Sequence, residues 1–236
     1  MRFVRTESGI AVERQGQPPL PIRQIIGIGL NYRAHALEQG QQLPERPVIF
    51  SKNLGAAALH GEDIVVPLVC QDREQVDFEG ELAVVLGDAT RDVPRDRALD
   101  RVLGYCVAND VSARWWQKQG SGGQFFRGKS FDSFCPLGPA LTPASATLDP
   151  GALRLVTRVN GTVMQDSNTS DLIFSVPTLI SELSRGTTLP EGTVIITGTP
   201  GGVGMARTPQ VWLRHGDVVE IEIEKLGVLR NRVRFE

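Results

Sequence analysis

The stretch VDFEGELAVVLG, from Val76 to Gly87, sets acidic residues directly before an unbroken apolar run. The run Leu82–Leu86 is typical of a strand that is buried on both faces, so it has to lie inside a sheet. Glu79 and Glu81 are two residues apart, which turns both side chains to the same face of a strand. Carboxylates at the end of a buried strand repel one another and cost free energy unless they are protonated or neutralised by a cation.

A metal ion is one way to neutralise these carboxylates. An oxygen-only cluster, with no His or Cys nearby, suits Mg²⁺, Mn²⁺ or Ca²⁺ and not zinc. Asp77 is expected on the same face, and Asp110, in VANDVS, ends another apolar stretch and could complete the cluster. Glu220, Glu222 and Glu224 have the same spacing, but they alternate strictly with Ile, which indicates a half-exposed strand with a solvated acidic face. Spacing alone therefore leaves both a metal site and a solvated face open.

Strand patterns outnumber helix patterns along the chain. They predict an α+β fold that is predominantly β, without a regular β-α-β alternation. The stretch Leu153–Gln165 predicts a hairpin with Asn160-Gly161 at its turn. Short helices are predicted at residues 31–40, Pro94–Leu103, Ala113–Lys118 and Pro177–Gly186. With 236 residues the chain suits one large domain, or a domain with a small appendage. We expect a short strand or hairpin segment at residues 1–24 and the main domain at residues 25–236.

The stretch GQFFRGKS, Gly123 to Ser130, matches the phosphate-loop pattern G-x-x-x-x-G-K-[ST]. A phosphate loop follows a buried strand and opens a helix. Here RWWQKQGSGG precedes the pattern, and Pro136 and Pro139 follow it too closely for a helix to continue. GIGLNY begins like a dinucleotide fingerprint but has Tyr32 where the third glycine should be. Nucleotide binding is therefore not expected, and Lys129 needs another role.

Composition excludes several classes of function. The formal net charge is −2 and there is no Lys/Arg run, so no nucleic-acid partner is expected. No apolar run approaches the length of a membrane span, and the N-terminus lacks the apolar core of a signal peptide. Cys70, Cys106 and Cys135 are isolated, which argues against a disulfide framework or a zinc site. We predict a cytoplasmic protein with no membrane contact.

His35 and Glu38 lie three residues apart on a predicted helix, so they can face each other. A carboxylate beside an imidazole orients the ring and raises its basicity, which is the usual support of a general base. An ordinary pair on a helix surface has the same spacing, and both interpretations remain open. His60 and His215 lie in predicted turns and are expected at the surface.

Other polar residues allow two interpretations each. Arg114 lies one helical turn after Asp110, and Lys129 follows a glycine-rich, aromatic loop. Either could bind an anionic substrate or pair with a surface acid. Thr199, in TGTP, ends an apolar strand, where its hydroxyl and backbone N–H groups could bind a carboxylate or form only a tight turn.

Taken together, these stretches resemble the fumarylacetoacetate hydrolase family over residues 25–234. The resemblance rests on several long motifs in the same order, namely NYRAHALE, FEGELAVVLG, GYCVANDVSARWWQ, RGKSFDSFCPLGP, VNGTVMQDSNTSDLIFSVPTLISELS, TGTPGGVG and LRHGDVVEIEIEKLGVLRNRV. It implies a mixed-strand β-roll with short peripheral helices, a catalytic domain at residues 25–236 and a homodimer. The chain departs from the family at Lys52-Asn53, where a proline usually follows the lysine.

The resemblance also implies the roles of particular residues. It implies one Mg²⁺ or Mn²⁺ held by Glu79, Glu81 and Asp110, with Asp77 outside this ligand set. The resemblance implies a catalytic dyad on a mobile lid at His35 and Glu38 and a lysine for substrate or oxyanion at Lys129. It also implies groups that bind substrate carboxyl or oxo oxygens at Arg114, Gln117 and Thr199.

Substrates of such a family are 2-oxo acids or their enols, often with a second carboxylate, and the metal acts as a Lewis acid that stabilises an enolate. The presence of His35 and Glu38 favours C–C cleavage, either hydrolysis of a 3-acylpyruvate or decarboxylation of an oxaloacetate-like acid. The alternative is isomerisation of 2-hydroxyhepta-2,4-diene-1,7-dioate or decarboxylation of 5-oxopent-3-ene-1,2,5-tricarboxylate in aromatic catabolism. A non-catalytic metal-binding scaffold is a further hypothesis, against which the intact His35, Glu38 and Lys129 argue.

Overall fold

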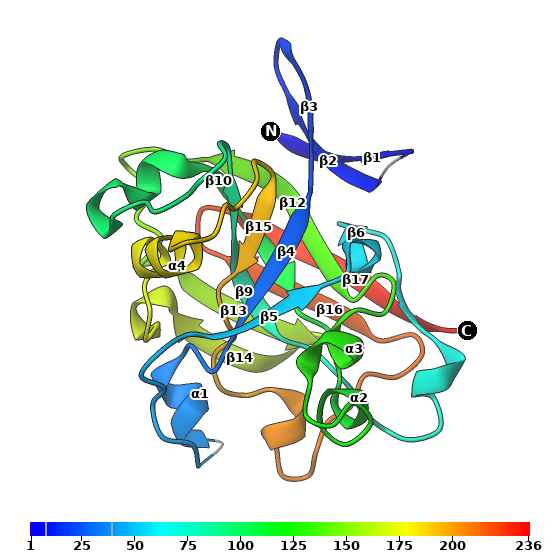
Figure 1. Cartoon of the computed structure of the whole chain (residues 1–236). Helices are drawn as coiled ribbons and strands as arrows, with labels where there is room; N and C mark the ends of the chain where they lie inside the picture. Colours follow the sequence, from blue (N-terminus) through cyan, green and yellow to red (C-terminus); the bar gives the residue numbers. More distant parts are fainter. Residues whose placement is uncertain (8, 39) are drawn as a thin grey trace.

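Strands make up most of the ordered structure. The computed structural model describes residues 1–7, 9–38 and 40–236. Figure 1 shows sheets that curl around one another, with a few short helices at the periphery. The prediction of a predominantly β, α+β fold of the roll type is confirmed. Among the described residues, no helix is long and apolar enough to cross a membrane.

The largest sheet has seven strands in the order β5-β4-β15-β9-β10-β12-β6. Their bounds are β5 (Val48–Lys52), β4 (Gln24–Gly29), β15 (Thr193–Ile196), β9 (Gly80–Leu86), β10 (Val102–Asn109), β12 (Cys135–Pro143) and β6 (Ala57–Leu59). Strand β9 lies in the middle, and every residue in it is buried. Leu82 and Val84 point into one apolar cluster, whereas Ala83 and Val85 point into the other. The apolar run is therefore a strand covered on both faces, as predicted.

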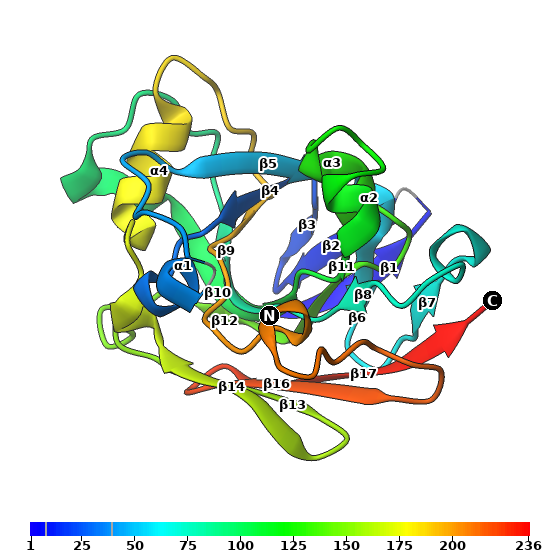
Figure 2. The ribbon, with the colours of Figure 1, turned by 90° about the horizontal axis from the view of Figure 1, so that it is seen from below.

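A second sheet of five strands, in the order β14-β13-β16-β17-β7, covers one face of the first. Its bounds are β14 (Thr162–Asn168), β13 (Arg154–Val159), β16 (Val218–Ile223), β17 (Gly227–Phe235) and β7 (Ile64–Val66). Figure 2 shows it closing one side of the roll. Ile221 and Ile223 enter the shared core, while Glu222 and Glu224 are exposed, which confirms the predicted solvated acidic face. The β13–β14 turn at Asn160-Gly161 has φ values of 50° and 78°, the conformation that a two-residue hairpin turn requires.

The N-terminal segment forms a separate three-stranded sheet of β1 (Arg2–Thr6), β2 (Gly9–Arg14) and β3 (Gln17–Pro21). Figure 1 shows the β2–β3 end projecting from the body of the molecule. Phe3 and Val12 join the same apolar cluster as Val85, so this sheet packs on the outer face of the seven-stranded sheet. The backbones of Met1 and Leu141 exchange hydrogen bonds of 3.0 Å. The division of the chain at residue 24 stays a prediction.

The α-helices are short, with bounds α1 (Arg33–Glu38), α2 (Arg114–Lys118), α3 (Phe125–Lys129) and α4 (Val176–Ser184). The helix predicted at Pro94–Leu103 is wrong as an α-helix. A 3₁₀ segment, Arg95–Arg101, occupies it, and Val102 then pairs with Leu86 at the start of β10. Sheet pairing thus overrides the helical pattern at its C-terminal end.

The close packing of α3 against α2 determines the position of Lys129. A Cβ atom on Gly128 would lie 2.4 Å from the backbone nitrogen of Gln117 and 2.8 Å from the carbonyl oxygen of Ala113. Only a residue without a side chain fits there, because a methyl group would have to displace backbone atoms. Gly128 therefore fixes the distance between the two helices, and with it the position of the neighbouring lysine.

We predict that Gly128→Ala lowers the free energy of unfolding by about 1–3 kcal/mol, the usual cost of overpacking a closely packed contact. Urea denaturation measures the effect as a lower midpoint. Gly151→Ala is the matched control, because its Cβ would meet only a side-chain oxygen of Asp149 at 3.3 Å. Equal midpoints for the two variants would show that the helices can separate without cost.

Candidate metal and active site

Glu79, Glu81 and Asp110 lie together where β9 begins and β10 ends. Glu81 is opposite Ala108 in the antiparallel pair, and the Asp110 backbone N–H donates to the Glu79 carbonyl at 2.9 Å. One oxygen from each carboxylate lies within 4.8 Å of the others, and all three residues are buried. The structure thus brings together the predicted ligand set, and the pairing of β9 with β10 is what does so.

Lys129 and Arg114 neutralise part of this cluster. The Lys129 Nζ atom donates to Glu79 at 2.7 Å, to Ser112 Oγ at 2.8 Å and to Asp110. Arg114 Nη2 donates to the other oxygen of Glu79 at 2.7 Å. Burial favours the protonated acid, but Arg114 and Lys129 outweigh it and hold the pKa of Glu79 well below its usual range. The predicted lysine therefore binds carboxylates in this structure.

Lys52 is a site residue that the analysis of the sequence missed. It ends β5 fully buried, and its Nζ atom donates to Asp110 Oδ1 and, at 2.8 Å, to the Phe134 carbonyl. Val48, Phe50 and Lys52 lie on the inward face of β5 and Ile49 and Ser51 on the outward face. The alternation within PVIFSK could have revealed an inward-facing lysine, which requires an internal anion.

Glu81 differs from its two neighbours because no cation contacts it among the described residues. Its carboxylate accepts only the Gly198 backbone N–H, at 2.7 Å. Burial, followed by the charges of Asp110 and Glu79, raises the pKa of Glu81 well above its usual range. A cluster of carboxylate oxygens in which one member lacks positive charge fits a hard divalent cation. We conclude that these residues could hold such an ion.

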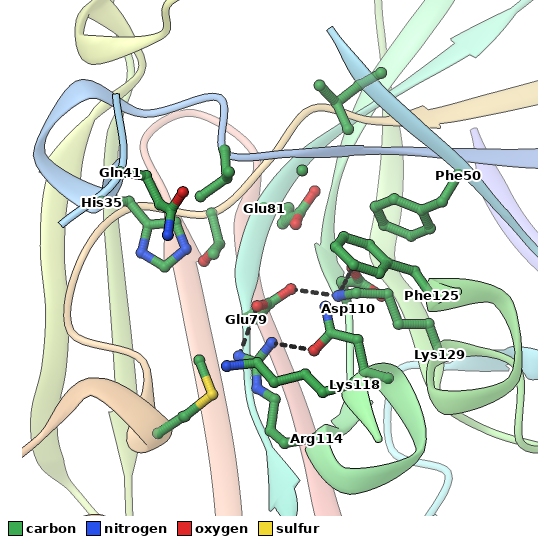
Figure 3. A pocket seen from close by; sticks show the side chains of 16 residues that line it. His35, Gln41, Phe50, Glu79, Glu81, Asp110, Arg114, Lys118, Phe125 and Lys129 are labelled. Carbon is green, nitrogen blue, oxygen red and sulfur yellow. Dashed lines mark hydrogen bonds and ion pairs between the residues drawn. The ribbon is translucent and has the colours of Figure 1, made fainter. Parts of the chain in front are cut away.

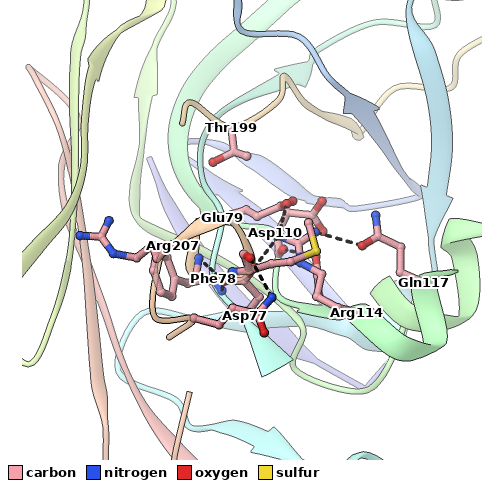
Figure 4. A network of polar contacts seen from close by, with 12 residues as sticks. Asp77, Phe78, Glu79, Asp110, Arg114, Gln117, Thr199 and Arg207 are labelled. Carbon is pink, nitrogen blue, oxygen red and sulfur yellow. Dashed lines mark hydrogen bonds and ion pairs between the residues drawn. The ribbon is translucent and has the colours of Figure 1, made fainter. Parts of the chain in front are cut away.

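Asp77 does not join the cluster, contrary to the face that strand alternation assigned to it. The strand pattern breaks at Phe78 and Glu79, so Asp77 belongs to β8 (Val76–Asp77), which pairs with β11 (Ser112–Ala113). Its carboxylate accepts from Arg114 Nε at 2.9 Å and Nη2 at 2.8 Å, and from the Gly204 N–H at 2.7 Å. Asp77 therefore holds Arg114 in place beside Glu79, as Figure 4 shows.

A cavity of about 240 Å³ opens in front of the three carboxylates. Every predicted site residue except Glu38 lines it, and the full set is His35, Glu79, Glu81, Asp110, Arg114, Gln117, Lys129 and Thr199. Figure 3 shows the carboxylates between two walls, with the rings of Phe50 and Phe125 at one end and Arg114 and Lys118 at the other. The cavity therefore offers both an apolar and a cationic surface to a ligand.

His35 reaches this cavity from helix α1. Its Nδ1 atom lies 3.5 Å from Glu38 Oε2, and the ring is 4% exposed. Both oxygens of Glu38 accept the Gly202 N–H at 3.1 Å, and Asp171 accepts the Ala34 N–H at 3.0 Å, so α1 is tied down at both ends. Burial lowers the pKa of His35, against the opposing charges of Glu79 and Glu38. The ring is therefore neutral at pH 7 and can accept a proton.

Thr199 and Gln117 complete the set. The Thr199 hydroxyl donates to the Gly80 carbonyl at 3.0 Å and accepts from Gln165 Nε2 at 2.8 Å. Gln165, buried in β14, thus orients Thr199 and is a second residue that the sequence did not single out. Gln117 Oε1 accepts from Arg114 Nη1 at 3.0 Å, which leaves the amide nitrogen of Gln117 as its donor toward a ligand.

Comparison with known proteins places these features in a family. A model described as the C-terminal domain of fumarylacetoacetate (FAA) hydrolase matches residues 24–234. The oxaloacetate tautomerase YisK of Bacillus subtilis is 44% identical, over 91% of this chain and 71% of that protein. Other curated tautomerases are matched over about two thirds of their length.

Two solved structures are similar across the whole fold. Fumarylpyruvate hydrolase from Pseudomonas aeruginosa, solved in complex with Mn²⁺ and pyruvate, has a TM-score of 0.85 and 31% identity, with 99% of each chain covered. The 2-hydroxyhepta-2,4-diene-1,7-dioate isomerase from Mycobacterium marinum has a TM-score of 0.78 and 38% identity, over 90% of this chain and 75% of the other. The relatives thus catalyse different reactions on one fold.

We predict that Mn²⁺ stabilises the parent protein through Glu81. At about 100 times the dissociation constant, a bound ion adds about 2.7 kcal/mol, which corresponds to about 5–10 °C in Tm for a chain of this size. Glu81→Gln should lose most of this shift, whereas Glu224→Gln, in the exposed acidic run, should keep it. Thermal denaturation with and without Mn²⁺ measures the shift, and equal shifts in both variants would exclude Glu81 as a ligand.

We also predict that the His35 ring titrates below its ordinary pKa of 6.5, because burial outweighs the nearby carboxylates. Two-dimensional NMR of the metal-free protein follows the ring signals between pH 4 and 8, a range of about two units on either side of an ordinary histidine pKa. His35→Gln identifies the signal by removing it. A midpoint at or above 6.5 would mean that Glu79 and Glu38 dominate and that the ring is partly charged at neutral pH.

Proposed function

This chain belongs to the fumarylacetoacetate hydrolase family, and we propose that it is a divalent-metal-dependent enzyme that acts on small 2-oxo acids through their enol forms. The observation that carries the proposal is the set of three buried carboxylates within 4.8 Å of one another, facing a cavity that a neutral histidine also lines. A cation held by Glu79, Glu81 and Asp110, Mg²⁺ or Mn²⁺, would polarise the carboxylate and 2-oxo oxygens of the substrate.

Keto–enol tautomerisation of an oxaloacetate-like acid is the reaction that we place first. It needs one group that removes a proton from C3 and positive charge near the C2 oxygen. His35 serves as the base: its Nε2 atom takes the C3 proton, the C3–H electron pair forms the C2–C3 double bond, and the C2=O π pair moves onto the C2 oxygen, which then takes up a proton to give the enol. Lys129 lines the same cavity and supplies positive charge near that oxygen. The name of the Bacillus relative supports this choice.

Cleavage of a C–C bond is the second candidate, and the His35–Glu38 contact favours it. A neutral imidazole oriented by a carboxylate at 3.5 Å can activate a water molecule for attack on the distal carbonyl of a 3-acylpyruvate. Decarboxylation of oxaloacetate passes through the same enol without water. Isomerisation of a 2-hydroxy-dienedioate stays the alternative. The homodimer and the cytoplasmic location stay predictions.

We predict that the protein with Mg²⁺ exchanges the C3 protons of oxaloacetate with solvent deuterium, because enolisation removes one of them. ¹H NMR in D₂O follows this exchange, and parallel samples contain acetylpyruvate and 2-hydroxyhepta-2,4-diene-1,7-dioate. EDTA should abolish the reaction, and His35→Gln should slow it about 10²–10⁴-fold, as loss of a general base does.

The products separate the candidates. Deuterium in intact oxaloacetate supports tautomerisation, acetate plus pyruvate from acetylpyruvate supports hydrolysis, and a shifted double bond in the dienedioate supports the isomerase. His60→Gln is the control, because His60 is exposed, is not among the residues that line the cavity, and accepts the backbone N–H of Arg230. Full activity in EDTA would refute the metal-dependent proposal, and full activity of His35→Gln would refute the role of His35.

A further inference from the structure

The cavity has three basic side chains on its walls, Arg114, Lys118 and Lys129. Two of them are already neutralised by the protein. Lys129 is paired with Glu79 and Asp110, and Arg114 is paired with Asp77 and Glu79, all at the buried end of the cavity. Arg114 and Lys129 are therefore engaged at the carboxylate cluster and are not placed to bind a second anionic group at the other end of a ligand.

Lys118 is in a different situation. It ends α2, four residues after Arg114, so the two side chains lie on the same face of the helix. Among the described residues no carboxylate forms an ion pair with Lys118, and the charged group that acts on it is Arg114. Partial burial and the charge of Arg114 both lower the pKa of Lys118. An anion bound here would offset the repulsion between two neighbouring cations.

The opposite wall cannot take a second anion. Phe50 and Phe125 meet there with ring centroids 5.7 Å apart, and Lys129 Nζ already lies 5.0 Å from the Phe50 ring. Figure 3 shows these rings on the far side of the carboxylates from Lys118. A ligand with charges at both ends is therefore better accommodated with its second charge toward α2 than toward these rings.

We propose that Lys118 binds the distal carboxylate of a dicarboxylic 2-oxo acid whose other carboxylate and oxo group lie at Glu79, Glu81 and Asp110. The proposal rests on the proposed function, and it deepens it by assigning selectivity for dicarboxylic substrates to one side chain. Because Lys118 is exposed at the cavity mouth, its effect is moderate in size and falls as salt rises.

Calorimetric binding in Mg²⁺ tests this with two ligands of equal length, 2-oxopentanedioate and 2-oxopentanoate, which differ only in the distal carboxylate. The parent protein should bind the dioate more tightly. Lys118→Met should weaken binding of the dioate about three- to tenfold and leave binding of the monoacid unchanged, so that the preference for the dioate disappears. Lys118→Arg should restore the preference, because it restores the charge.

Lys225→Met is the matched control, an exposed lysine outside the cavity, and should retain the parent's preference. A preference that survives in Lys118→Met, or an equal loss of affinity for both acids, would overturn the role of Lys118 while leaving the proposed function in place. Failure of the parent protein to bind either acid in Mg²⁺ would overturn the proposed function together with this inference.

Discussion

The neutralisation of two buried carboxylates, Glu79 and Asp110, is the constraint on which the rest of the structure depends. Glu79 and Asp110 are fully covered, and each needs a cation that the neighbouring strands cannot supply. The positive charges come from other elements: Lys52 from β5, Lys129 from α3 and Arg114 from α2. The charge pairs therefore depend on the closed roll, because the three cations lie on elements that reach the cluster only by packing against it.

The same arrangement prepares the site for chemistry. Glu81 is left with a backbone N–H as its partner, so the cluster as a whole remains short of positive charge on the side that faces the cavity. His35 is held over that side by a helix fixed at both ends, with its pKa lowered by burial. Carboxylate ligands for a cation and a base for a proton thus face one small cavity, which is what enolisation of a 2-oxo acid requires.

Patterns that depend on neighbouring residues were predicted well. The buried strand at Leu82–Leu86, the turn at Asn160-Gly161 and the exposed acidic face of β16 all follow from local periodicity and turn chemistry. The errors occur where a distant partner decides. The segment predicted as an α-helix at Pro94–Leu103 is 3₁₀ over Arg95–Arg101, and its last residues join the sheet because Val102 pairs with β9. Asp77 leaves the expected face because β8 pairs with β11.

By itself, the sequence determined that Glu79 and Glu81 lie on one face beside a doubly covered strand, because side chains alternate with a period of two. It could not decide what lies opposite that face, since Glu220 and Glu222 have the same spacing and face solvent. Only the tertiary structure brought Lys52, 58 positions before Asp110 in the sequence, into contact with the cluster. The spacing of residues along a strand determines which face of the sheet each side chain points to. Burial and charge pairing, in contrast, depend on elements that meet only in the folded chain.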